Sequence, residues 1–133
     1  MTTTPLVETV ETAVMIIREL NLDTRDKQAI TEPAELAQLL AGLTALAAGL
    51  PQLINQLGRW LTDQHAHQQI HATSDLTADH LVTAATCDLA RARQIAHDLT
   101  ATLDTAHQHT TDLSAAADHH NRSNTHQGVS FHP

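Results

Sequence analysis

The spacing of apolar residues along the chain predicts three helices and no strands. The first is expected at about 5–20, where apolar side chains recur every three or four residues behind a Thr4 N-cap and Pro5 at the first helical position. The second is expected at about 33–70 and the third at about 75–118. In the third helix the charged residues all lie outside a heptad repeat of apolar and small positions. These positions are Val82, Ala85, Leu89, Ala92, Ala96, Leu99, Leu103, Ala106, Thr110, Leu113 and Ala117.

The second predicted helix contains a long run, 36–58, without a charged side chain, bounded by Glu35 and Arg59. A seven-residue repeat passes through this run and predicts a helix packed against partner helices. Its positions are Leu36, Leu43, Leu50 and Leu57 in one row, and Leu39 or Leu40, Leu46, Leu53 and Trp60 in the other. Pro51 removes one backbone hydrogen bond, so we expect a kink near it. Because the repeat continues past the proline, a bent helix is favoured over two separate ones.

Folding the third helix back on the second about residues 73 and 74 gives a long antiparallel hairpin. This register places Leu57 near Ala90 and Trp60 near Cys87, so that large side chains meet small ones, and Cys87 is expected to be buried. We expect the first helix to pack on the hairpin, giving an all-α, three-helix bundle-like domain at 1–118. The segment 119–133, rich in His and Asn, is expected to be a disordered, flexible tail.

This predicted domain leaves apolar surface uncovered, because a first helix of about sixteen residues is too short for hairpin arms of about 55 Å. We therefore interpret the chain as a non-enzymatic interaction or adaptor protein with a coiled-coil-like surface. It would act as a homodimer or other homo-oligomer, or by docking to a helical protein partner. The predicted interface residues are Leu43, Leu46, Leu50, Leu53, Leu57 and Trp60.

Motif analysis gives no sign of an enzyme or of a cofactor. There is no glycine-rich phosphate loop, no Gly-x-Ser-x-Gly elbow and no Cys-x-x-Cys pair, and Cys87 is the only cysteine. The net charge of −8 argues against a nucleic-acid partner, which requires clustered Lys and Arg. The N-terminus has no basic region followed by an uninterrupted apolar segment, so we expect a cytoplasmic protein. The excess of Arg over Lys, with abundant Ala, indicates a high-GC bacterial genome.

Histidine is unusually frequent, with eleven residues in the chain, and this leaves a second function class open. His67 and His71 are four residues apart at the end of the second helix, and His80 lies across the turn, so these three are the candidate metal ligands. Imidazole groups that titrate near pH 6.5 would also move the net charge from −8 toward zero on acidification. A metal- or pH-responsive binding module is therefore the first alternative.

A membrane-associated helical protein is the second alternative, because the run 36–58 is long enough to cross a bilayer. Against insertion, the run contains Pro51 and four amide side chains that would each need a partner in hydrocarbon. No Lys or Arg cluster flanks it, and a single span has no need of a heptad repeat. We therefore expect a packed helix rather than a membrane span.

Overall fold

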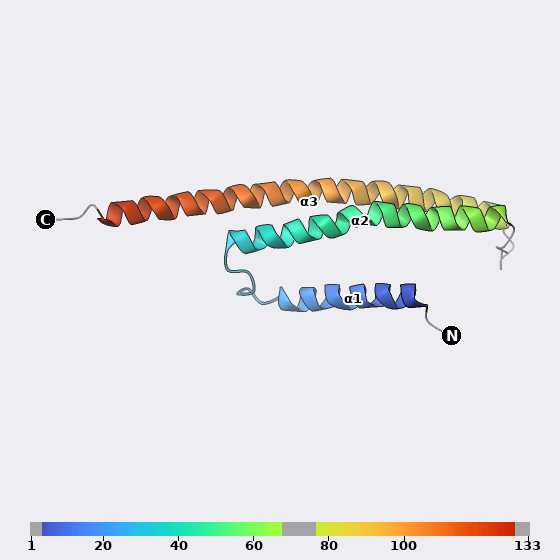
Figure 1. The fold of residues 1–133 in the computed structure, drawn as a ribbon, viewed down its shortest axis with the longest axis horizontal. Coiled ribbons are helices and arrows are strands. Elements are labelled where there is room, and N and C mark those ends of the chain that lie inside the picture. The colour runs from blue at the N-terminus through green and yellow to red at the C-terminus, as the bar shows by residue number, and fades with distance from the viewer. Residues whose placement is uncertain (1–3, 68–76, 130–133) are drawn as a thin grey trace.

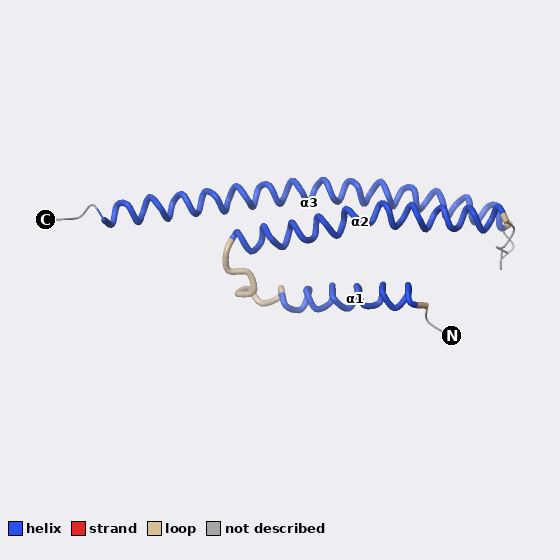
Figure 2. The backbone as a smooth tube through the Cα atoms, viewed as in Figure 1, coloured by secondary structure: helices blue, strands red, loops and turns tan. Residues whose placement is uncertain are grey.

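The structure of the protein is a computed structural model that describes residues 4–67 and 77–129. Within these ranges the chain forms three helices and no strand: α1 (Pro5–Asp23), α2 (Pro33–Ala66) and α3 (Ala78–Val129). Helices α2 and α3 pack side by side as the two arms of a long hairpin (Figures 1 and 2). The all-α prediction is confirmed, and so is the pairing of the second and third helices.

Helix α1 begins as the sequence predicts, because the Thr4 hydroxyl accepts a hydrogen bond from the Val7 N–H at 3.3 Å and Pro5 follows it. The helix ends at Asp23, and the backbone N–H of its C-cap residue, Thr24, donates to the Leu20 carbonyl. The connector to α2 contains a short turn in which the Gln28 N–H donates to the Asp26 carboxylate at 2.9 Å.

Helix α2 remains one helix through Pro51, as predicted, and it changes direction part-way along its length (Figure 1). At its start, the Glu35 carboxylate accepts hydrogen bonds from the hydroxyl and the N–H of Thr31, at 2.8 and 3.3 Å. This contact satisfies the amide of Thr31, which precedes the helix, and the Glu35 charge lies at the positive end of the helix. The last residue of α2 is Ala66; the predicted end near residue 70 and the turn at 71–75 lie outside the described residues.

Helix α3 begins after Thr77, whose hydroxyl accepts a hydrogen bond from the His80 N–H at 3.2 Å. It then runs to Val129, so the prediction that structure ends at residue 118 is wrong for 119–129. Residues 78–127 of α3 contain no glycine, the residue that most weakens a helix interior apart from proline. Once a helix is established, it extends across polar residues at low cost. At 1.5 Å per residue α3 is about 78 Å long and α2 about 51 Å, so α3 projects beyond the start of α2.

The register of the hairpin agrees with the prediction. Three cross-helix contacts define it: a Cβ atom at Gly58 would lie 3.9 Å from a Leu89 methyl carbon, the Arg93 guanidinium donates to the Asn55 amide oxygen at 3.0 Å, and His65 contacts Asp79. The predicted neighbours Leu57 and Ala90 adjoin the first of these contacts, so the axial alignment of the two helices is correct.

The face of α2 that contacts α3 differs from the predicted one. Most of the buried and half-buried residues of α2 form a heptad row that lies next to the leucine row: Ala37, Leu40, Thr44, Ala47, Pro51, Ile54, Gly58, Leu61 and His65. The other half-buried residues, which flank this row, are Ala34, Leu50, Asn55 and Gln64. On α3, by contrast, most predicted positions whose side chains are described are buried or half-buried, and the exceptions among them are Leu99 and Leu113, at 45% and 60% exposed. Small residues at a helix contact let the backbones approach closely, which explains why this row faces α3.

Helix α1 does not complete a three-helix bundle. In the described structure no Cα atom of α1 comes within 8 Å of a Cα atom of α2 or α3, and every residue of α1 is exposed. Its apolar stripe includes Val10 at 58% and Val14 at 44% exposed. Figure 1 shows α1 running back along the side of α2 that lies away from α3. The predicted packing of the first helix on the hairpin is therefore wrong for this structure.

Candidate interaction surface

One flank of α2 carries a continuous exposed apolar surface, which we call the leucine face. It contains all six residues that the sequence predicts as an interface, and Leu50 is half-buried beside α3. The exposed fractions of the outer side chains are large, with Leu46 at 57%, Leu53 at 47% and Trp60 at 61%. The leucine face comprises Leu36, Leu39, Leu43, Leu46, Leu50, Leu53, Leu57 and Trp60.

The size of the leucine face separates it from ordinary scattered surface leucines. At roughly 180 Å² for a fully exposed residue, its exposed fractions amount to on the order of 600 Å² on α2 alone. The largest apolar patch on a typical soluble monomer is about 300–600 Å² and is often functional, so the leucine face lies at the upper end of this range. No charged side chain interrupts the face between Glu35 and Arg59. A patch of this size and continuity is typical of an interaction site.

Helix α3 extends the same flank. Arg93 contacts Asn55 on the opposite flank of the hairpin, and Ile95 lies two residues further on, which is about 200° around the helix. Ile95 is therefore on the leucine side, where it is 58% exposed, and Leu81, two heptads earlier, is 37% exposed. Sequence reasoning missed both residues, because neither belongs to the predicted apolar row of the third helix.

The opposite flank of the hairpin has a groove of about 330 Å³ beside Gly58, with a mostly apolar surface and a few charged and polar side chains. Its lining combines two arginines, Arg59 and Arg93, with Asp63 and two threonine hydroxyls. The Arg93 guanidinium is engaged by Asn55, and the groove contains no histidine or cysteine that could act as a nucleophile or base. The two flanks therefore differ in charge: the leucine face carries none, whereas the groove is lined by arginine and aspartate side chains.

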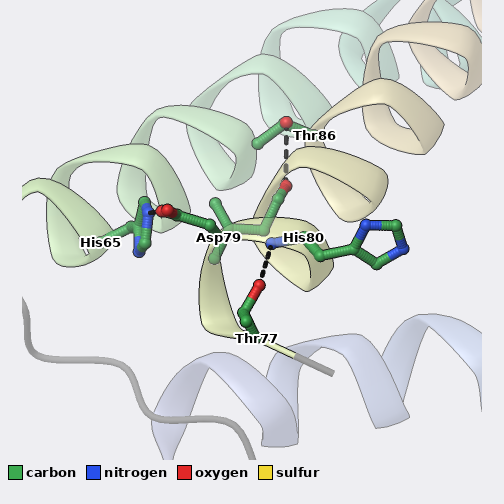
Figure 3. Close-up of polar contacts among 6 residues, drawn as sticks. His65, Thr77, Asp79, His80 and Thr86 are labelled. Carbon is green, nitrogen blue, oxygen red and sulfur yellow. Dashed lines mark hydrogen bonds and ion pairs between the residues drawn. The ribbon is translucent and has the colours of Figure 1, made fainter. Parts of the chain in front are cut away.

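The histidines near the hairpin end do not form a metal site in the described residues. His65 contacts the Asp79 carboxylate, whereas the His80 ring points away from this pair (Figure 3). His67 donates from Nδ1 to the Asp63 carbonyl at 2.6 Å, and His71 lies outside the described residues. Among described residues, no group of three His, Cys, Asp or Glu side chains could hold a metal ion.

The contact between His65 and Asp79 instead joins the ends of α2 and α3 (Figure 3). The Asp79 side chain is 83% exposed, and exposed pairs of this kind contribute little to stability. The sequence pattern gave no reason to select Asp79, because the pair depends on the register of the hairpin.

Two further features bear on function. Cys87, expected to be buried, is an exposed free thiol. By length and composition α2 also meets the requirements of a membrane-spanning helix, although core helices of soluble proteins meet the same requirements.

Comparison of the chain with protein-family models, curated proteins and solved structures gives no match. The functional argument therefore starts from the geometry of the hairpin and from the chemistry of its two flanks.

Proposed function

We propose that this protein is a non-enzymatic helical interaction protein that works by burying its leucine face against another helical surface. The exposed leucine face is the observation that supports this proposal. Its side chains are apolar, uninterrupted by charge and arranged on a seven-residue repeat, which suits interdigitation with the side chains of a second helix.

The total surface of the chain supports the same proposal. The accessible surface is 10946 Å², whereas a compact monomer of 14.4 kDa exposes about 6,800 Å². The excess of roughly 4,000 Å² reflects two long helices that share only one contact row and a third helix that touches neither. Permanent protein complexes commonly bury about 2,000–5,000 Å² in total, or about 1,000–2,500 Å² per partner, so an assembly could remove part of this excess.

Self-association is the form of interaction that we propose first, with docking to a different helical protein as the alternative. Between Glu35 and Arg59 there is no charge on any side of α2 to mark a solvent-facing surface. A helix that is uncharged all round is suited to neighbours on several sides, and α3 supplies only one of them.

The test is the absolute mass of the purified chain, measured by light scattering from about 1 to 200 μM, a range that brackets common dimer affinities. We expect a mass above 14.4 kDa that falls on dilution. A mass of one chain at every concentration would contradict self-association and leave docking to another protein as the form of the proposal.

Flotation with neutral vesicles separates the membrane alternative, which the length and composition of α2 favour. We expect the protein to stay at the bottom of the gradient, because its amide side chains and Pro51 disfavour insertion into hydrocarbon. Co-flotation with the vesicles, together with a monomeric mass in buffer, would replace the proposal with a membrane-associated function.

A further inference from the structure

We propose that the groove beside Gly58 is a binding site for a small amphipathic carboxylate. The carboxylate group would be held by Arg59 and Arg93, and the apolar body of the ligand would lie on the apolar surface of the groove. The groove lies on the flank opposite the leucine face, so its occupation is independent of the self-association proposed above.

The groove has the size and the surface of a small-molecule site. Its volume of about 330 Å³ is at the lower end of the range typical of such sites, about 300–1,000 Å³. Gly58 has no side chain to fill this space, and a Cβ atom there would lie 3.9 Å from a Leu89 methyl carbon. Ile54, Leu89 and Ala90 supply apolar lining. This combination of space and apolar surface suits the hydrocarbon part of a small ligand.

Two guanidinium groups from different helices line the same groove. Arg59 comes from α2 and Arg93 from α3, in a chain of net charge −8 that has seven Lys and Arg residues in all. Within 4–67 and 77–129, no hydrogen bond or ion pair engages the Arg59 guanidinium. Arg93 donates from one nitrogen to the Asn55 amide oxygen at 3.0 Å and retains further N–H donors. A carboxylate is an anion whose two oxygens match this planar fork of donors.

The other polar groups of the groove favour a ligand with a single negative charge. The hydroxyls of Thr62 and Thr86 donate to backbone carbonyls of their own helices, at 3.0 and 2.9 Å, so their protons are already used. Asp63 is the acidic residue of the lining, and with two arginines it gives the lining a net charge of +1. Arg59 precedes Asp63 by four residues, the less favourable order for an ion pair along a helix, and the described structure has no ion pair between them.

A series of three ligands tests the two halves of the proposed contact. The ¹⁵N-labelled full chain is titrated with octanoate, octan-1-ol and acetate, and binding is followed by the side-chain Nε–H signals of Arg59 and Arg93. Octanoate has about ten non-hydrogen atoms, so we expect a dissociation constant of about 1 mM or below. Octan-1-ol lacks the charge and acetate lacks the apolar body. At equal concentration each should therefore shift these signals far less than octanoate does.

Substitutions of exposed residues locate the site without disturbing the hairpin. Arg59→Gln and Arg93→Gln should each weaken octanoate binding about threefold to tenfold, because each removes a charge-assisted contact. The matched control is Arg91→Gln, which removes the same charge from α3 outside the groove lining and should leave the dissociation constant unchanged. Asp63→Asn should tighten binding about twofold, since it removes a repulsive charge. Leu53→Asp, on the leucine face, should have no effect on the signals of the groove arginines.

The possible outcomes distinguish this site from the leucine face. Octan-1-ol shifts as large as those of octanoate, or a loss of octanoate binding in Leu53→Asp, would mean that apolar surface alone holds the ligand, and either result would overturn the site. Equal weakening by Arg59→Gln and Arg91→Gln, or no response to octanoate, would overturn it as well. A chain that is monomeric yet binds octanoate through Arg59 and Arg93 keeps the site and refutes self-association.

Discussion

Replacing Leu53 by Asp tests the leucine face most directly, because Leu53 lies on this face and outside the contact row with α3. The hairpin should therefore fold in the variant, and only association should suffer. Ala47, by contrast, is 3% exposed between the two helices, so a charge placed there would damage the hairpin itself. The difference between these two positions distinguishes an interface from a core.

The magnitude follows from the surface that Leu53 leaves exposed in a single chain. Its exposed fraction is 47%, or about 85 Å² at roughly 180 Å² per leucine, which is worth about 2 kcal/mol on burial at 25 cal/mol per Å². A symmetric dimer contains two copies, so the loss is about 4 kcal/mol, or close to a thousandfold in the dissociation constant. Desolvation of the introduced carboxylates would add to this loss.

The assay is sedimentation equilibrium over a concentration series, with circular dichroism on the same samples. The matched control is Gln52→Asp, which places the same charge one residue away, off the leucine face, and has a comparable helix-propensity cost. We expect Leu53→Asp to sediment as a single chain with wild-type helix content per residue, and Gln52→Asp to follow the wild-type mass curve.

Two results would refute the reasoning. Equal mass curves for Leu53→Asp and Gln52→Asp would mean that the leucine face is not the association surface. Loss of helix content in Leu53→Asp, with helix content retained in Gln52→Asp, would mean that the face is part of the core of a single chain.

Three further predictions concern the hairpin itself. Gly58→Ala should raise the melting temperature by about 4 °C in a thermal scan. The new methyl group would meet Leu89 at an ordinary contact distance, and a glycine inside a helix costs about 1 kcal/mol of stability. A lower melting temperature would show that the helices lie closer than described. A double-mutant cycle of His65→Ala and Asp79→Asn should give a coupling energy of at most about 1 kcal/mol, because the pair is exposed. A larger coupling energy would mean that the contact contributes more to hairpin stability than an ordinary surface pair. Deleting residues 1–24 should lower the helical signal in proportion to α1 and leave the hairpin melting temperature unchanged, whereas a marked drop would show that α1 packs on the hairpin in solution.

The sequence predicts the helices well because their signals are local. Thr4 with Pro5 marks the start of α1, and the heptad rows mark α2 and α3 along most of their length. The antiparallel register also follows from the sequence, since a short turn between two long helices permits few alignments. The C-terminal part of α3 was missed because its polar residues have no apolar period, and helix extension needs no such period.

The contact face of α2 could not be predicted in the same way. Two neighbouring rows of α2 both repeat every seven residues, one rich in leucine and one rich in small residues such as Ala47 and Gly58. Apolar content favours the leucine row, so the sequence predicts large residues of α2 against small ones of α3. Close approach of two backbones depends instead on small residues at the contact, and that advantage is visible only when both helices are placed together.

The sequence by itself determined that this chain is helical, where its helices begin and how its two long arms align, because these properties depend on residue type and on spacing along one helix. Tertiary structure decided which row of α2 faces α3, and therefore which row stays exposed. Because of that choice, the leucine row between residues 36 and 60, which the sequence predicts to pack against α3, forms an exposed surface instead. The physical reason is that one helix presents several faces, and only the packing of its partner selects the one that is buried.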